Sequence, residues 1–153
     1  MTRQKITPFL WFDDKAEEAA KFYVSLFRDS AITGGTPGPN DVPLVVEFQL
    51  GGLQFLALNG GPHFKFNEAV SLSIDCHSQA EVDELWEKLS AGGSKSQCGW
   101  LKDKYGLSWQ VVPAALSHLL GSADREKAGR VMNAMMKMTK LDSQALQDAA
   151  DGK

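Results

Sequence analysis

Residues 70–113 read VSLSIDCHSQAEVDELWEKLSAGGSKSQCGWLKDKYGLSWQVVP. The opening residues alternate between apolar and polar types, which predicts a strand over 70–75. Ser78-Gln79-Ala80-Glu81 forms a capping box, because the Ser78 side chain can accept a hydrogen bond from the backbone N–H of residue 81 while Glu81 reaches back. The box predicts a helix that stops at Gly92-Gly93. The expected buried stripe of this helix is Val82, Leu85, Trp86 and Leu89.

Two short strands, around 96–102 and 107–112, complete the stretch. The turn between them, Asp103-Lys104-Tyr105-Gly106, has glycine where a positive φ is favoured. Pro113 stops the last strand, because proline has no backbone N–H to give to a sheet. We interpret the stretch as a strand–helix–strand–strand–strand (βαβββ) module, three strands of which are marked by these signals.

The same order occurs earlier in the chain. An apolar run over 6–12 has the length of a strand, and Asp14 follows it at the position of a helix N-cap. Strands over 44–50 and 53–58 flank Gly51-Gly52, a two-residue hairpin signal, after a loop that contains 34–39. Between the first strand and that loop, apolar residues recur at helical spacing. They are Ala16, Ala19, Ala20 and Tyr23.

The pattern therefore predicts an α+β protein in which two βαβββ modules, 4–60 and 69–113, occupy residues 1–113. A helical tail over 114–150 follows them. Short helices are expected over 114–120, over 124–138 and from Asp142 onward. We expect the tail to pack on the modules or on a partner subunit, with its methionines in that contact.

Bulk composition narrows the class of protein. A length of 153 residues suits one domain, and a net charge of −3 with a pI near 5.6 argues against a nucleic-acid partner. No apolar stretch is long enough for a membrane span, and no secretory leader is recognisable. The two cysteines do not form a disulfide framework. We expect a cytoplasmic protein that binds neither membranes nor nucleic acid.

Strand alternation predicts which side chains point away from the helices. In 70–75 the apolar residues should face the helix, which leaves small hydroxyls on the other side. Such a surface suits a wettable binding site with apolar walls. The predicted helix-free set is Thr7, Phe9, Trp11, Val45, Glu47, Gln49, Phe55, Ala57, Asn59, Ser71, Ser73, Asp75, Ser108, Gln110 and Val112.

Three motifs, TPFLWF at 7–12, ALNGGP at 57–62 and QCGWLKD at 97–103, resemble the PhnB-like subgroup of the vicinal-oxygen-chelate (glyoxalase/bleomycin resistance/dioxygenase) superfamily. The hairpin at 103–110 resembles the last hairpin of that superfamily. The subgroup is labelled "3-demethylubiquinone-9 3-methyltransferase". The resemblance implies that the paired modules form a cup-shaped mixed sheet and that the protein is a homodimer.

The resemblance also implies where a metal would bind. Metal-dependent members carry His, Glu or Gln ligands at inward positions of four strands, and the corresponding residues here are Thr7, Ala57, Ala69 and Gln110. Only Gln110 could ligate, and one amide oxygen does not supply the several donors that a divalent ion needs. We therefore expect no metal and no other cofactor.

Several side chains remain as candidates for chemistry. Glu47 could act as an acid or base if buried among aromatics, or it could pair with Lys102. His63 could act as a base if its loop closes over the cup. Cys98 could be a nucleophile or a packed filler. The expected ligand-binding residues are Trp11, Phe55, Asn59, Trp100, Ser108 and Gln110.

Three functions stay open at this point. The leading hypothesis is metal-independent binding of a small molecule, with or without catalysis. A methyltransferase is the second, although no G-x-G-x-x-G turn joins a strand to a helix. The third is non-enzymatic sequestration of a ligand, of the bleomycin-resistance type.

Overall fold

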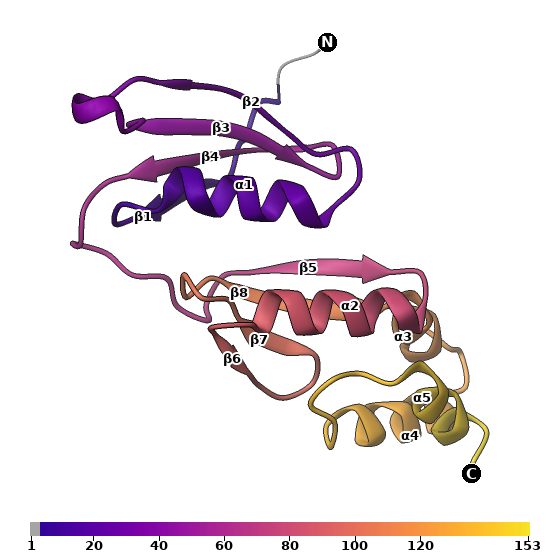
Figure 1. Ribbon diagram of the computed structural model, residues 1–153. Helices are drawn as coiled ribbons and strands as arrows, with labels where there is room; N and C mark the ends of the chain where they lie inside the picture. Colours follow the sequence, from indigo (N-terminus) through magenta and orange to yellow (C-terminus); the bar gives the residue numbers. More distant parts are fainter. Residues whose placement is uncertain (1–3) are drawn as a thin grey trace. The chain divides into compact units, whose positions relative to one another are not determined.

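The computed structural model describes residues 4–153, which fall into two compact units that meet in sequence at Phe66 and Asn67. Each unit contains a four-stranded mixed sheet with a helix packed on one side (Figure 1). The prediction of an α+β fold built from two βαβββ modules is confirmed. The joining of the modules into one cup stays a prediction.

The first unit contains β1 (Phe9–Phe12), α1 (Ala16–Leu26), β2 (Ala31–Thr36), the 3-10 turn η1 (Pro39–Asp41), β3 (Val45–Leu50) and β4 (Leu53–Asn59). The strand order is β1-β4-β3-β2, with β1 parallel to β4 and the other pairs antiparallel. The predicted Gly51-Gly52 hairpin is confirmed, since both glycines have positive φ. The loop predicted at 34–39 is partly wrong, because residues 31–36 add an edge strand to β3.

Helix α1 packs through the predicted stripe, in which all four side chains are buried. Tyr23 lies against Phe48 at a ring-centroid distance of 6.4 Å, and Phe48 stacks on Phe55 at 5.3 Å. The predicted N-cap, Asp14, is wrong. The helix starts one residue later, and the Oδ1 atom of Asn59 accepts a hydrogen bond from the backbone N–H of Ala16 at 2.9 Å.

The second unit contains β5 (Ser71–Cys76), α2 (Gln79–Ser90), β6 (Ser94–Lys95), β7 (Trp100–Lys102) and β8 (Ser108–Pro113), in the strand order β5-β8-β7-β6. The predicted capping box is confirmed: Ser78 Oγ accepts from the backbone N–H of Glu81 at 3.1 Å, and the Glu81 carboxylate accepts from the backbone N–H of His77 at 2.9 Å. The predicted stripe of α2 is buried.

The turn between β7 and β8 is organised by Asp103, whose side chain is only 2% exposed. Its Oδ1 atom accepts hydrogen bonds from the backbone N–H groups of Tyr105 and Leu107, at 2.9 and 3.1 Å. Its Oδ2 atom accepts from the indole N–H of Trp109 at 2.9 Å. Gly106 has a φ of +88°, as the turn predicted.

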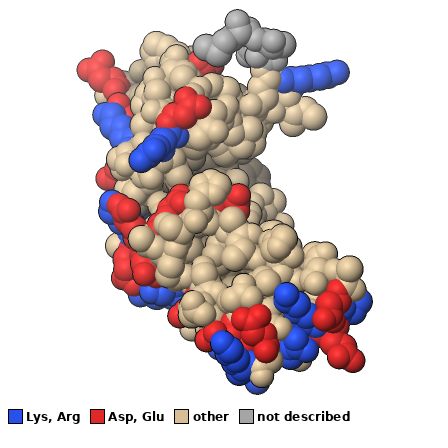
Figure 2. Space-filling view, turned by 90° about the vertical axis from the view of Figure 1, so that its right-hand side faces the viewer, with Lys and Arg blue, Asp and Glu red and all other residues tan. Residues whose placement is uncertain are grey.

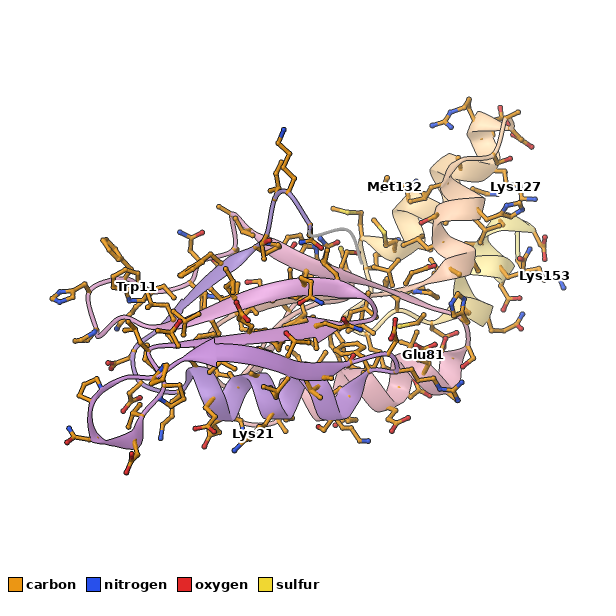
Figure 3. All side chains as sticks on the ribbon, turned by 90° about the horizontal axis from the view of Figure 1, so that it is seen from above. Trp11, Lys21, Glu81, Lys127, Met132 and Lys153 are labelled. Carbon is orange, nitrogen blue, oxygen red and sulfur yellow. The ribbon has the colours of Figure 1, made fainter. Side chains whose placement is uncertain are left out.

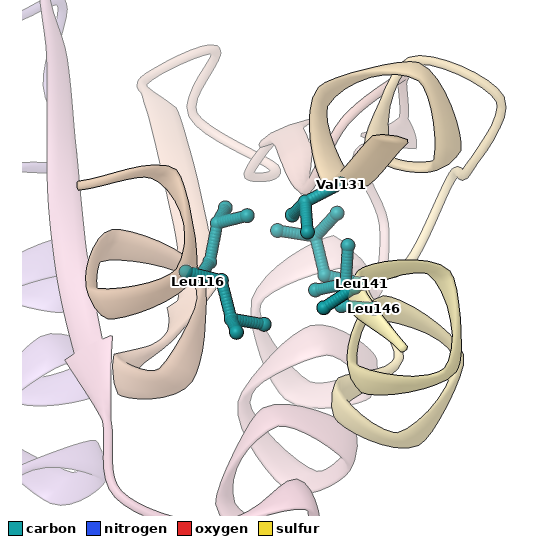
Figure 4. Packing of buried hydrophobic residues seen from close by; sticks show 6 residues of the cluster. Leu116, Val131, Leu141 and Leu146 are labelled. Carbon is teal, nitrogen blue, oxygen red and sulfur yellow. The ribbon is translucent and has the colours of Figure 1, made fainter. Parts of the chain in front are cut away.

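The tail forms α3 (Ala114–Leu120), α4 (Arg125–Met135) and α5 (Ser143–Ala150), close to the predicted ranges. Asp142 is the N-cap of α5, and its side chain accepts from the backbone N–H of Ala145 at 3.0 Å. The three helices enclose an apolar cluster (Figure 4). Its buried members are Leu116, Leu119, Val131, Leu141, Leu146 and Ala150.

Hydrogen bonds fasten the tail to the second module. The backbone N–H groups of Cys98 and Gly99 donate to the carbonyls of Met138 and Thr139, each at 2.8 Å. Gln79 of α2 donates to the carbonyl of Leu141 at 3.0 Å and accepts from the backbone N–H of Ser143 at 2.8 Å. The tail thus packs on the module that precedes it.

Charge is dispersed on the face that Figure 2 shows, where acidic and basic side chains are interspersed and no basic stripe forms. A stripe of that kind is the usual footprint of a nucleic-acid partner. No helix within residues 4–153 is long and apolar enough to cross a membrane.

Candidate functional site

The helix-free side of the second sheet carries most of the polar candidates. The strand register places Lys102, Ser108 and Ser71 in one row across β7, β8 and β5, and Trp100, Gln110 and Ser73 in the next row. We call these six residues the polar face. The alternate side chains of the same strands, Leu101, Trp109 and Val111, are buried on the other side, against α2.

Hydrogen bonding on the polar face is incomplete. The side-chain amide of Gln110 donates to Ser71 Oγ at 2.9 Å. Ser108 is only 1% exposed, and its Oγ atom has no hydrogen-bond partner within the described part of the chain. A buried hydroxyl without a partner costs free energy, so folding alone does not explain a serine at this position.

Lys102 is held by an ion pair with Glu68, a residue that precedes β5. The ammonium group lowers the pKa of the Glu68 carboxyl, chiefly through the hydrogen bond from Lys102. Glu68 therefore stays ionised at pH values where a free glutamate would begin to take up a proton. The side chains remain 38% and 62% exposed for Lys102 and Glu68, so the pair is open to solvent and to competing ions.

The helix-free side of the first sheet is apolar by contrast, and we call it the aromatic face. Phe9 and Trp11 of β1 lie beside Leu56 and Leu58 of β4. The Trp11 ring (labelled in Figure 3) is fixed by the loop after β4: its indole N–H donates to the carbonyl of Gly61 at 2.9 Å, and Phe64 meets it edge-on at 4.9 Å.

Gly60 is required next to this ring. A Cβ atom at residue 60 would lie 2.4 Å from the indole of Trp11, which is a severe overlap. The packing of this loop against Trp11 therefore depends on the absence of a side chain at Gly60.

Two predicted ligand-binding residues are on the wrong side of the first sheet. Phe55 is 3% exposed and stacks on Phe48 beneath α1. Asn59 also faces α1, where it accepts from Ala16 and donates to the carbonyl of Pro43 at 2.9 Å. Ala57, placed on the same side by the sequence pattern, is fully buried with them. The residues of β4 that do point away from the helix are Gln54, Leu56 and Leu58.

The catalytic candidates occupy separate places in the first unit. Glu47 is half-buried on the helix-free side of β3, and its carboxylate lies over Gly34 of β2, where a Cβ atom would come within 2.5 Å of it. His63 is exposed, in the loop that holds Trp11. The predicted pairing of Lys102 with Glu47 is wrong, since Glu68 is the partner of Lys102.

The predicted ligand positions do not gather metal donors. Ala57 lies under α1, and Ala69 precedes β5. Within residues 4–153 no group of three or more His, Cys, Asp or Glu side chains could hold a metal ion. Gln110 is the one amide among the four positions, and it bonds to Ser71.

An open groove of about 380 Å³ lies elsewhere in the first unit, between α1 and the β2–β3 hairpin. Its walls include Glu17 and Lys21 of α1, which pair with each other at 3.1 Å, and residues 34–38. None of the six residues expected to bind a ligand lines this groove, although Val45 of the predicted helix-free set does.

Residues 4–112 match the family model described as 3-demethylubiquinone-9 3-methyltransferase. The chain belongs to this family. The PhnB protein from Bacillus cereus is 35% identical, with a TM-score of 0.68 over 72% of this chain and all of that one. The structure of PA1353 from Pseudomonas aeruginosa is 21% identical, with a TM-score of 0.59 over 72% of this chain and 98% of that one.

The fold is also found in a glyoxylase/bleomycin resistance protein/dioxygenase domain from Frankia. That domain is 17% identical to this chain, with a TM-score of 0.51 over 73% of this chain and 93% of that one. No curated protein matches the chain. These findings confirm the PhnB-like resemblance and the glyoxalase-like fold. The family match ends at residue 112, so α3, α4 and α5 lie outside it.

The structure adds two residues that the sequence pattern did not single out for a site in this family member. Lys102 could have been found, because it has the same strand parity as Trp100 and so shares its face. Glu68 could not, since it lies in a loop and only the folded backbone brings its carboxylate to Lys102.

The two cysteines should differ sharply in reactivity. Burial, with a smaller contribution from the nearby charges of Glu81 and Asp75, raises the pKa of the Cys76 thiol to about 12. Cys98 is partly exposed, in the turn before β7. Because the thiolate is the reactive form, Ellman's reagent at mildly alkaline pH should detect one fast thiol in the native protein and two after unfolding. Cys98→Ser should abolish the fast reaction, and two fast native thiols would contradict this assignment.

Proposed function

We propose that this family member binds a small organic molecule on the polar face of its second sheet, without a metal ion or other cofactor. The observation that carries the proposal is the buried, unpartnered hydroxyl of Ser108. Such a group destabilises the folded protein and is best explained if a bound molecule completes its hydrogen bonding. Ser71, Gln110 and Trp100 supply further polar groups and an aromatic surface around it.

The first unit offers a second, separate candidate surface. Its aromatic face, with Trp11 fixed in place, has apolar contact area of the kind that ligand sites use. If this unit carries catalysis, Glu47 and His63 are the groups we propose for proton transfer. We further propose a cytoplasmic homodimer. Free Cys76 and Cys98 suit a reducing compartment, and exposed Ile6, Phe9 and Phe64 suit a subunit contact.

A thermal-shift screen against a metabolite library, followed by titration of the hits, tests the binding function. Ser108→Ala should weaken a hit by about fivefold, because one net hydrogen bond contributes ~1 kcal/mol. The same substitution should leave the melting temperature unchanged or higher, since it removes an unpaired buried hydroxyl. A residue that served only folding would behave in the opposite way.

Ser90→Ala is the matched control, because Ser90 is also a buried serine but lies on α2. It should leave the affinity of each hit unchanged. Hits that bind Ser108→Ala as tightly as the unaltered protein would contradict the proposal. Binding of S-adenosylmethionine at micromolar affinity would instead favour the methyltransferase that the family description names.

A further inference from the structure

The first row of the polar face presents hydrogen-bond donors. Ser71 Oγ accepts from Gln110, so the hydroxyl hydrogen of Ser71 remains to be donated. Ser108 has a hydroxyl hydrogen without a partner among the described residues. Lys102, in the same row, adds an ammonium group. Three donors in one row call for a ligand that offers acceptor oxygens.

The spacing of these groups suits a compact molecule. Neighbouring strands lie about 4.8 Å apart, so the row from Lys102 across Ser108 to Ser71 spans roughly 10 Å. Trp100 stands two residues before Lys102 on β7 and thus about 7 Å away along the strand. A planar ring on Trp100 would place an attached acidic group near Lys102 and Ser108.

The Lys102 ammonium group is already paired with a carboxylate of the chain itself. Glu68 reaches Lys102 from the loop before β5, and its side chain is 62% exposed. Solvent weakens an exposed ion pair of this kind, so an incoming anion can replace it at small cost. The Glu68 carboxylate also identifies the chemical group for which this position is suited.

From these observations we infer that the ligand of the polar face is a small organic carboxylate with a planar ring. Its carboxylate would bind Lys102 and Ser108, its ring would lie against Trp100, and Glu68 would hold the anion position until the ligand displaces it. This inference rests on the proposed function, because it names the ligand class of the same site.

Titration of benzoate and benzamide at neutral pH, followed by ¹⁵N NMR, tests the inference. The two probes have the same ring, and only benzoate is charged. Benzoate should shift the Trp100 indole and Gln110 side-chain signals.

Two variants test the anion position. Glu68→Gln should increase the affinity for benzoate by about threefold to tenfold, because the competing carboxylate is lost. Lys102→Met should decrease that affinity by about tenfold, since charge-assisted hydrogen bonds are about twice as strong as neutral ones. Benzamide should respond to neither substitution.

Glu84→Gln is the matched control, because Glu84 makes a similarly exposed ion pair with Lys88 on α2 at 2.6 Å. It should leave the affinity for benzoate unchanged. Equal benzoate affinity in the unaltered protein and Glu68→Gln would overturn the inference, as would the absence of any benzoate shift on the polar face. If neutral compounds bind this face while benzoate does not, the proposed function survives and only the carboxylate assignment fails.

Discussion

Replacing Asp103 with alanine should lower the free energy of unfolding by about 3 kcal/mol or more, because each buried donor left without a partner costs ~1–3 kcal/mol. The carboxylate accepts from two backbone N–H groups and from the Trp109 indole, and it is almost fully buried. The substitution therefore strands three donors at once. Urea denaturation followed by tryptophan fluorescence measures the loss.

Asp103→Asn changes the hydrogen bonding of this side chain while keeping its shape nearly the same. The asparagine carbonyl can keep the bonds to Tyr105 and Leu107, but its NH₂ group would face the Trp109 N–H. A loss of about 2 kcal/mol, smaller than that of the alanine variant, is expected, because two donors, the Trp109 N–H and the asparagine NH₂ group, lack an acceptor. Equal losses in both variants, or no loss in Asp103→Ala, would show that the turn does not depend on these bonds.

Leu141→Ala should be similarly damaging, with an expected loss of about 3 kcal/mol, because leucine-to-alanine changes in tight cores cost 2–5 kcal/mol. Leu141 is 1% exposed and belongs to the apolar cluster of the three tail helices. It also packs closely on Gly99, where an added Cβ atom would lie 2.9 Å from its side chain. The residue thus joins the tail to the turn before β7.

The same denaturation experiment, with Met136→Ala as the control, checks this second expectation. Met136 is 60% exposed, and its truncation should change the free energy of unfolding by less than about 0.5 kcal/mol. An intact second unit in Leu141→Ala, with the same midpoint as the unaltered protein, would show that the tail contributes nothing to the stability of that unit.

Most of the second module was predictable, because its local signals agree with one another, but the edge strand β6 was missed and the strand predicted over 96–102 is confined to β7. The capping box, the buried stripe of α2 and Gly106 each indicate one backbone path, and the structure follows it. Ser108 and Gln110 share a face as strand alternation predicted, and Trp100, expected among the ligand-binding residues, lies on the same face. The edge strand β2 was missed because its glycines are typical of loops, and only pairing with β3 makes it a strand.

The error at β4 has a specific physical cause. Both sides of this strand are apolar, with Phe55 and Ala57 on one side and Leu56 and Leu58 on the other, so composition does not decide which side meets the helix. The hairpin decides it. A two-residue turn at Gly51-Gly52 pairs Leu50 with Leu53 and therefore Phe48 with Phe55, which puts both rings under α1.

A sequence pattern reveals neither the pairing of Glu68 with Lys102 nor the missing hydrogen-bond partner of Ser108. Strand parity assigns a side chain to a face, but it does not state whether a hydroxyl on that face finds a partner. Likewise, no periodic pattern indicates which side chain an acidic residue in a loop will contact. Both features depend on the tertiary path of the chain around β5.

In each unit the first strand finds its parallel partner only in the last one: β1 pairs with β4, and β5 pairs with β8. Neither sheet can therefore be completed during synthesis until the end of its own module has left the ribosome. β5 cannot pair until β8 has been synthesised. The last helix, α5, is synthesised later still. Contacts so distant in sequence slow folding. Until its partner strand has been synthesised, each of β1 and β5 therefore has unpaired backbone groups that can form hydrogen bonds with other chains.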